Sequence, residues 1–200
     1  MPKGRGIRAA QAEATRAALV RAARKLFARN GFHATPTMDI VREAGVTRGA
    51  LQHYFARKED LFQAVFEQTG REMVREASKR VEVEGWDALL DGFRTFILTL
   101  KSLEDYRIAF IDGPAVLGWA EWRRLQADYG LRLMEMGIED GIAKGRVAKQ
   151  PTRALAHLIL SIVEEASLMV LNAEELGVDP EDVAFAMISM LSSIGGRPPD

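Results

Sequence analysis

Apolar residues recur at a spacing of three to four positions along almost the whole chain, and this spacing most constrains the fold. Over residues 15–30, Leu19, Ala23 and Phe27 line one face of a helix, which Gly31 stops. The same period returns in later segments, and no stretch shows the alternation of a half-buried strand. Residues with high helix propensity are abundant. The sequence therefore predicts an all-helical protein.

Two short helices around a tight turn follow the first one. Thr37 is placed to cap a helix over 38–44, which Gly45 ends. Thr47 is placed to cap a second helix over 48–54. This arrangement is typical of a helix-turn-helix, although short helices around a glycine also occur in many other helical proteins.

The remaining helices are separated by glycine and proline. Asp112-Gly113-Pro114 predicts a break, and Asp179 before Pro180 marks the start of the last helix. We expect these helices over residues 58–80, 86–100, 106–111, 116–144, 152–173 and 180–193. The first of them is long enough to join the helix-turn-helix stiffly to the remainder of the chain.

The formal net charge of −1 hides an asymmetry between the two ends. Residues 1–80 hold 16 Lys and Arg against 8 Asp and Glu, whereas residues 81–200 hold 11 against 20. A basic N-terminal part on an acidic body favours a polyanionic partner at one end, and a chance cluster of solvated charges is the alternative.

Neither export nor a membrane span is expected. The chain contains no cysteine, which suits a reducing cytoplasm, and its basic N-terminal stretch has no apolar core of the kind that a secretory signal needs. The most apolar window, 155–173, contains His157, Glu164 and Glu165, which would be costly at a bilayer centre. We interpret this window as a buried helix of a cytoplasmic protein.

The helix after Thr47 has the size and chemistry to enter a DNA major groove. Gly49 and Ala50 permit close approach, and Arg48 is a long cation in the first turn. The remaining candidates for contacts to bases or phosphates are Thr37, Thr47, Gln52, His53, Tyr54 and Lys58. The alternatives are that the Tyr54 and Phe55 rings are buried and that His53 is an ordinary surface residue.

Residues 37–62, TMDIVREAGVTRGALQHYFARKEDLF, preceded by TRAALVRAARKLFARNGF at 15–32, resemble the DNA-binding signature of the TetR repressor family. The resemblance covers residues 15–66. Thr47 replaces the usual serine cap, and Gln52 replaces a tyrosine, so operator preference does not carry over from the family. Lys58 matches the lysine that meets a backbone phosphate. Arg57 stands where a small capping residue is commoner, so the sequence does not identify the residue that caps the helix over 58–80.

The resemblance implies a domain order for the whole chain. Residues 1–14 would be a flexible basic arm with Lys3, Arg5 and Arg8, residues 15–60 the helix-turn-helix domain, 61–194 a ligand-binding and dimerisation domain, and 195–200 a tail. The closing helices, 152–173 and 180–193, would pair with those of a second copy. Independently, helix 152–173 has two apolar faces, one for its own core and one for a partner.

Residues that bind an effector are harder to identify. Candidates are Phe93, Phe96, Trp119, Trp122, His157 and Glu165, which would suit an apolar or amphiphilic molecule. Aromatic residues at helical spacing are more often ordinary core. For the charged residues, the alternatives are that Glu164 is exposed and that Glu165 pairs with an arginine.

An enzyme is not expected. The sequence has no nucleophile elbow, phosphate-binding glycine loop or zinc-protease motif, so no catalytic residue, cofactor or metal ligand is predicted. The hypothesis is a homodimeric repressor that binds a palindromic operator and is released by a small molecule. The alternatives are a DNA-binding regulator or architectural module without a small-molecule switch, and a dimeric interaction protein that no longer binds DNA.

Overall fold

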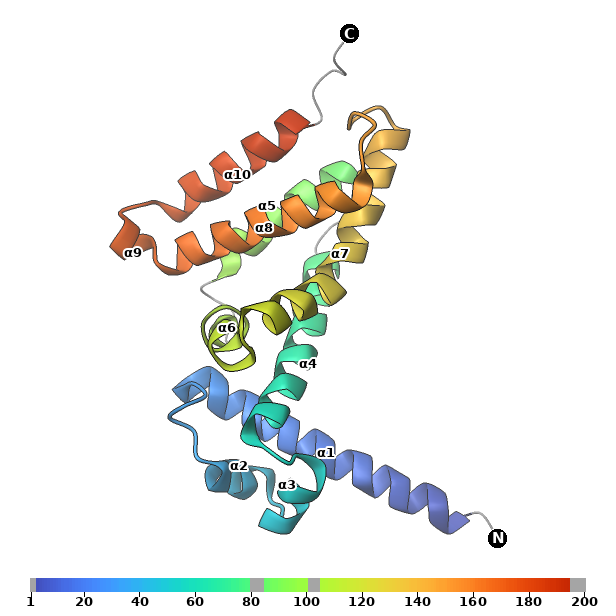
Figure 1. The fold of residues 1–200 in the computed structure, drawn as a ribbon, viewed down its shortest axis with the longest axis vertical. Helices are drawn as coiled ribbons and strands as arrows, with labels where there is room; N and C mark the ends of the chain where they lie inside the picture. Colours follow the sequence, from blue (N-terminus) through green and yellow to red (C-terminus); the bar gives the residue numbers. More distant parts are fainter. Residues whose placement is uncertain (1–2, 80–84, 101–104, 195–200) are drawn as a thin grey trace. The chain divides into compact units, whose positions relative to one another are not determined.

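The computed structural model describes residues 3–79, 85–100 and 105–194, and within these residues every regular element is helical (Figure 1). This confirms the predicted all-α fold. The elements are α1 (Lys3–Asn30), α2 (Thr37–Ala44), α3 (Arg48–Tyr54), α4 (Lys58–Lys79), α5 (Trp86–Thr99), the π-helical segment η2 (Arg107–Asp112), α6 (Gly113–Leu117), α7 (Trp119–Ala143), α8 (Thr152–Leu171), α9 (Ala173–Leu176) and α10 (Pro180–Ile194).

The chain divides into two compact units. The first contains the described residues up to Thr69 together with 105–122, and the second contains those from Gly70 to 100 together with 123–194. The sequence placed a boundary at residue 60 and assigned all of 61–194 to one domain. The structure instead groups the start of α4 and the segment 105–122 with the N-terminal helices.

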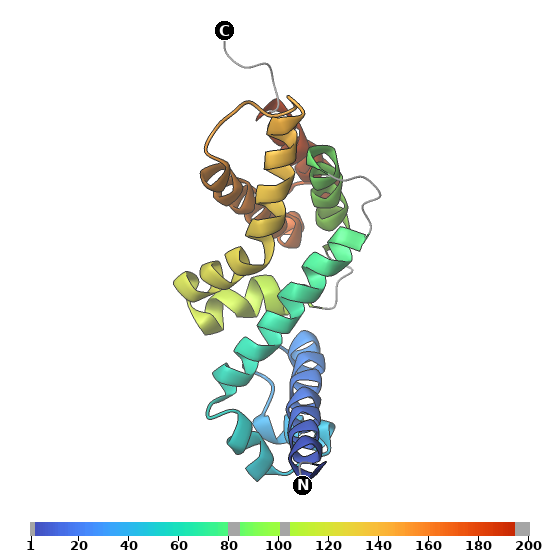
Figure 2. The ribbon, with the colours of Figure 1, turned by 90° about the vertical axis from the view of Figure 1, so that its right-hand side faces the viewer.

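The core of the first unit is formed by the apolar faces of its four N-terminal helices. In Figures 1 and 2 the first turns of α4 lie against α1, and the rings of Phe27 and Phe62 meet there with centroids 5.5 Å apart. Phe32, from the α1–α2 connection, stacks edge-on against Phe62 at 5.2 Å. Ile40 of α2 and Leu51 of α3 are buried in the same unit. This packing fixes the orientation of α3, the helix expected to contact DNA.

The N-terminal arm differs from the prediction. We expected a flexible segment through residue 14, whereas α1 is helical from Lys3 onward. Residues 9–14 contain four alanines, and alanine has the highest helix propensity, so this part of the segment favours continuation of the helix. The structure does not describe the side chains up to Arg8, so their contact with DNA stays a prediction.

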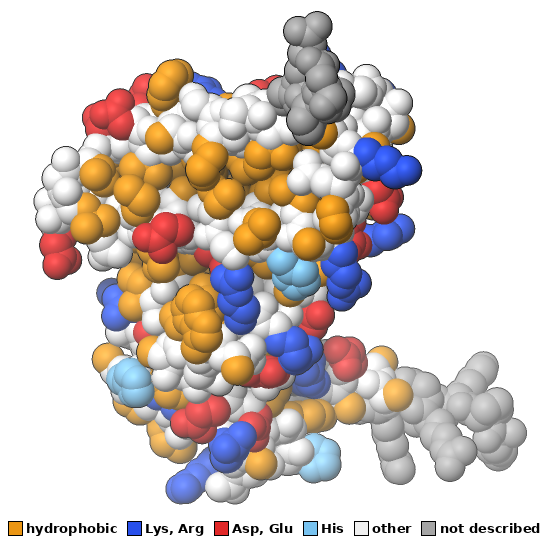
Figure 3. All heavy atoms as spheres, turned by 45° about the horizontal axis from the view of Figure 1, so that its top comes forward, with side chains coloured by type: hydrophobic (Ala, Val, Ile, Leu, Met, Phe, Trp, Pro, Cys, Tyr) orange, Lys and Arg blue, Asp and Glu red, His pale blue; other side chains and the backbone are white. Residues whose placement is uncertain are grey.

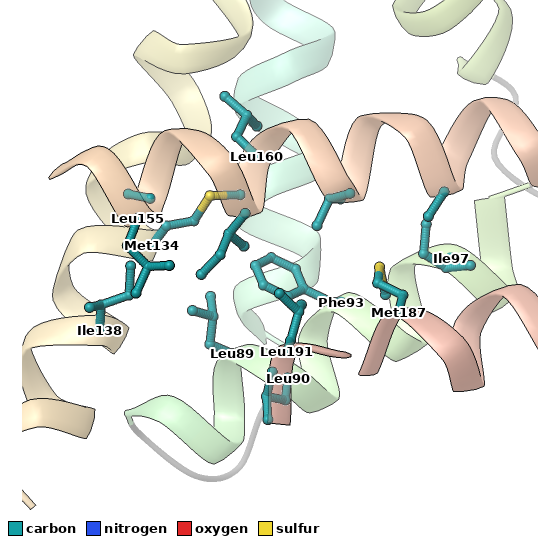
Figure 4. Close-up of a cluster of buried hydrophobic side chains, with 14 of the residues drawn as sticks. Leu89, Leu90, Phe93, Ile97, Met134, Ile138, Leu155, Leu160, Met187 and Leu191 are labelled. Atoms are coloured by element: carbon teal, nitrogen blue, oxygen red, sulfur yellow. The ribbon is translucent and has the colours of Figure 1, made fainter. Parts of the chain in front are cut away.

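The core of the second unit is formed by α5, α7, α8 and α10. Figure 4 shows Phe93 and Ile97 of α5 pointing toward Met187 of α10 beneath α8. Helix α8 is long and apolar enough to cross a membrane by composition, but half of that window is buried inside the protein. Length and composition alone are weak evidence for a span, and the buried residues support the interpretation as a core helix.

Two predicted helix boundaries in the middle of the chain were wrong. Asp112-Gly113-Pro114 does not interrupt the helical path, because η2 passes directly into α6 with Pro114 in its first turn. The break comes at Gly118, whose φ of 76° lies in the region that favours glycine. Helix α7 therefore begins at Trp119 and not near residue 116.

Candidate nucleic-acid interface

Helix α3 begins as the sequence predicts. Thr47 has an extended backbone, and its side-chain oxygen accepts a hydrogen bond from the Ala50 N–H at 3.1 Å. Before it, Gly45 takes a left-handed conformation, with φ of 65°, and its N–H bonds back to the end of α2. The turn and the cap together set the direction in which α3 leaves α2.

One face of α3 is buried and the opposite face is open. Leu51 packs into the core, whereas Arg48, Gly49, Gln52 and His53 are exposed. Ala50 and Tyr54 are half-buried, and the Tyr54 ring meets the His53 ring edge-on at 4.9 Å. Phe55 is buried, as expected of a core aromatic. The structure thus brings most of the predicted DNA-binding residues onto one surface.

Gly49 lies on this exposed surface, at a position where the fold does not require glycine. A Cβ added at Gly49 would come no closer than 3.9 Å to the Thr47 hydroxyl, and its backbone is ordinary helix, so neither packing nor conformation requires glycine there. Arg48 beside it has no charged partner within the part of the chain that the structure describes. A small residue next to an unpaired cation suits close approach to a phosphate or a base edge.

Thr37 does not cap α2, contrary to the prediction. The helix begins at Thr37 itself, and Pro36 occupies the capping position with an extended backbone and no side-chain hydrogen bond. The carbonyl of Pro36 instead accepts the N–H of Asp39 at 3.1 Å. The half-buried Thr37 side chain is thereby left without a capping role, and a contact with DNA remains a prediction.

Lys58 has an internal partner in this structure. Its ammonium donates a hydrogen bond to the carbonyl of Phe32 and lies 4.2 Å from the centroid of the Phe32 ring. Desolvation lowers the pKa of Lys58, and the nearby carboxylates of Glu59 and Asp112 oppose this effect. To reach a phosphate, as the family resemblance implies, the Lys58 side chain must leave Phe32.

The start of α4 is capped by a residue that sequence reasoning missed. The Asp60 carboxylate accepts the Arg57 N–H at 2.9 Å and the Arg57 guanidinium at 2.8 Å. The hydrogen bonds from Arg57 hold the pKa of Asp60 below its usual range. An acidic residue three positions into a helix is a known capping signal and could have identified this contact.

A second missed group ties the segment 105–122 to the rest of the first unit. The buried Asp112 accepts the backbone N–H of Phe32 at 2.9 Å, and the Arg107 guanidinium lies 3.7 Å from the same carboxylate oxygen. Arg24 of α1 forms an ion pair with Asp105. The Phe32 peptide is thus held by Asp112 at its N–H and by Lys58 at its carbonyl.

Packing reinforces this attachment. The Trp122 indole, only 1% exposed, donates to the Ala109 carbonyl at 2.8 Å. A Cβ on Gly113 would lie 2.9 Å from both Phe66 and Trp122, so only glycine fits between them.

The predicted effector residues do not form one group. Phe93 and Phe96 belong to the core of the second unit, whereas Trp119 and Trp122 belong to the first, with their rings 4.8 Å apart. A groove of about 310 Å³ between α5 and α10 is lined by none of the six, but by Arg94, Leu98, Glu181, Ala184, Phe185, Ile188, Ser189 and Ser192. The role of the six predicted residues in binding an effector stays a prediction.

The two adjacent glutamates of α8 are placed opposite to the alternatives considered from the sequence. Glu164 is buried and forms an ion pair with Arg123, while Glu165 is exposed, as is His157. Adjacent helical residues point about 100° apart, so only one of the pair can face the interior. His157 and Glu165 therefore lie on the outer face of α8.

Comparison with known proteins agrees with this architecture. Residues 19–65 match the family model "Bacterial regulatory proteins, tetR family", and residues 86–194 match "Tetracyclin repressor-like, C-terminal domain". The chain belongs to the TetR family. It is a DNA-binding transcriptional regulator, as the members of this family are.

Three relatives illustrate the match. A TetR-family regulator from Pectobacterium atrosepticum has a similar structure, with a TM-score of 0.72, 31% identity, and coverage of 91% of this chain and 92% of that one. The structure of RolR in complex with resorcinol has a TM-score of 0.71 at 21% identity, covering 96% and 98% of the two chains. The uncharacterised regulator YfiR of Bacillus subtilis is 26% identical over 84% of each chain.

Proposed function

We propose that this TetR-family regulator is a cytoplasmic repressor that binds a palindromic operator as a homodimer and is released by a small molecule. The observation that carries the DNA-binding part is the exposed face of α3, on which Arg48 points to solvent and packing does not require glycine at position 49. Arg48, Gln52 and His53 would read base edges, while Thr47 and the helix N-terminus would meet a phosphate. On DNA, the Lys58 ammonium would leave the Phe32 carbonyl and donate to a phosphate instead.

Exposed apolar residues on α8 and α10 support the homodimer. Leu158 is 62% exposed, Phe185 73% and Met190 48%, and Figure 3 shows hydrophobic side chains gathered on a face of the second unit. Isolated exposed apolar residues are ordinary, but a contiguous band usually marks an interface. A two-fold dimer would place two copies of α3 on one side of the duplex, which fits a palindromic site.

The attachment of segment 105–122 supports a route from an effector to DNA. This segment lies between α5 and α7 in the sequence, yet it packs in the unit that carries α3. A ligand that changes the conformation preferred by this segment would act on Phe32 through Asp112, and on Lys58 through Phe32. A ligand shifts such an equilibrium only by its difference in affinity for the two states.

The chemistry of the effector is expected to be apolar or amphiphilic, because the body is largely built from apolar helices. RolR, which shares the fold, was crystallised with resorcinol, a small aromatic molecule. This neighbour supports a small-molecule effector for the fold.

The first test is enrichment of genomic DNA fragments on the purified protein at two salt concentrations. An Arg48→Ala and Tyr54→Ala double variant serves as the control. We expect a discrete palindromic fragment that the native protein retains at the higher salt and the variant loses. Retention that is blind to sequence and lost with salt would contradict the proposal and indicate a generic phosphate binder.

A further inference from the structure

The buried ion pair of the second unit leaves one strong acceptor unused. The Glu164 side chain is 5% exposed, and its Oε2 atom bonds to Arg123 of α7. Its other oxygen, Oε1, is buried and has no hydrogen-bond partner within the described residues. Nearly all buried polar atoms in folded proteins are hydrogen-bonded, so such an oxygen calls for an explanation.

The groups around Glu164 are arranged to hold the carboxylate in place. The Arg123 guanidinium also donates to the Ser161 hydroxyl at 2.6 Å, and that hydroxyl in turn donates to the His157 carbonyl at 3.0 Å. Arg123 thus joins two residues on successive turns of α8. The Glu164 side chain is fixed through Oε2, which leaves Oε1 in a defined position.

The wall beside this pair is apolar. Leu160 precedes Glu164 by one turn of α8, and Figure 4 shows it on the side of α8 opposite to Phe93. On α7, Ala127 and Gly130 follow Arg123 along the same face, and a Cβ on Gly130 would lie 3.8 Å from Leu160. An apolar molecule beside these small residues would find Glu164 Oε1 as an acceptor that has no partner within the described residues.

We propose that Glu164 Oε1 is the recognition point for the effector, and that the effector is an apolar molecule bearing a neutral hydroxyl group. A hydroxyl would donate to Oε1 without adding charge. A cationic ligand would bring a second positive charge beside Arg123, and an anionic ligand would meet the Glu164 carboxylate. The inference rests on the proposed ligand-responsive function and specifies the chemistry of its ligand.

The test compares 4-ethylphenol with 4-ethylanisole, which has nearly the same shape but no donor. Affinities are measured by calorimetry on the full-length protein at pH 8. We expect the phenol to bind about 10-fold more tightly, as befits a hydrogen bond to a charged acceptor. The preference should disappear in Glu164→Met and persist in Glu165→Met, the matched control on the exposed face of the same helix.

Other probes distinguish the remaining outcomes. Tighter binding of 4-ethylbenzylamine or 4-ethylbenzoate would overturn the neutral-hydroxyl assignment. Equal affinity of phenol and ether, or binding of neither, would overturn the proposed site.

If Glu164→Met does not fold, the native protein still tests the proposal at pH 5.5. A protonated Glu164 can itself donate to the ether, so the preference for the phenol over the ether should narrow at this pH. His157→Gln is the control for the exposed histidine nearby.

The failure of this inference is distinguishable from the failure of the proposed function. Binding of the phenol with the expected preference, but without any change in operator affinity, would support the site and contradict the switch. Release from the operator by other compounds, with no preference for the phenol, would support the switch and contradict the role of Glu164.

Discussion

Asp112 in the first unit and Glu164 in the second are both buried carboxylates, but their surroundings differ. Asp112, 6% exposed, accepts the Phe32 N–H and lies near Arg107. Glu164, 4% exposed, is held by Arg123 through one oxygen, while the other has no partner among residues 3–79, 85–100 and 105–194. Burial raises the pKa of Glu164 to about 7, against the effect of Arg123.

The difference indicates two uses of a buried charge. Asp112 bonds to the main chain, so it positions the α1–α2 connection and, through Phe32, the ammonium of Lys58. Glu164 accepts a hydrogen bond from a side chain, and its second oxygen is available as an acceptor. This suits it to recognise a ligand. The two carboxylates are buried to a similar extent, so burial does not distinguish their roles. The hydrogen-bond partners of their oxygens do distinguish them.

The largest expected effect is on the stability of the first unit. Asp112→Ala leaves the Phe32 N–H and Arg107 without their buried partner and should lower the free energy of unfolding by about 3 kcal/mol. Urea unfolding followed by tryptophan fluorescence measures this, since the buried Trp122 is hydrogen-bonded within the same segment. Asp91→Ala, at an exposed position on α5, is the control and should change the value by less than about 0.5 kcal/mol. An equal effect of both substitutions would show that Asp112 does not stabilise the first unit more than an exposed carboxylate does.

Local signals in the sequence predicted the first unit well. Thr47 as a cap, Gly45 as a left-handed stop and the apolar spacing of α1 act over a few residues, so they can be recognised without tertiary information. The same reasoning identified Asp179, whose side chain accepts the Glu181 N–H at 2.7 Å at the start of α10.

Contacts distant in sequence could not be predicted in this way. The bond between Phe32 and Asp112 joins residues eighty positions apart, and the choice of Glu164 over Glu165 as the buried glutamate depends on where α7 presents Arg123. Helical periodicity gives the faces of α8 but not their partners. Periodicity likewise gives no sign that segment 105–122 packs with helices far from it in the sequence.

A second prediction separates the surface of the first unit from its interior. Arg48→Ala should weaken specific operator binding by about 2 kcal/mol, or roughly 30-fold, without changing stability, because Arg48 supports nothing in the fold. Asp112→Ala should lower the operator affinity, through Phe32 and Lys58, as well as the free energy of unfolding. Fluorescence anisotropy with labelled operator DNA, beside urea unfolding, measures the two quantities. A loss of stability in Arg48→Ala would show that α3 is not a free recognition surface.

Lys58→Ala should act differently from Arg48→Ala. The loss of one phosphate contact weakens binding to all DNA sequences and lowers the slope of log affinity against log salt by about one unit. The slope is measured by anisotropy from low to moderate salt. An unchanged slope would mean that Lys58 keeps its bond to the Phe32 carbonyl when the protein is on DNA.

The last prediction concerns the pH dependence of the contribution of Glu164 to stability. Because folding raises the pKa of this carboxyl from 4.5 to about 7, the folded protein retains a proton that the unfolded chain has lost between these pH values. The contribution of Glu164 to stability therefore falls as pH rises from about 5 to about 7 and then stays constant.

Glu164→Gln removes this titration, so the variant should gain up to about 2.5 kcal/mol in free energy of unfolding relative to the native protein on going from pH 5 to pH 8. Urea unfolding across this range measures the difference, with Glu165→Gln as the exposed control. His33, His53 and His157 are exposed and present in every variant, so the comparison isolates residue 164. Operator affinity without ligand should be unchanged in Glu164→Gln, unlike in Asp112→Ala. A parallel loss of DNA binding would show that both carboxylates serve the interface and that Glu164 is not reserved for a ligand.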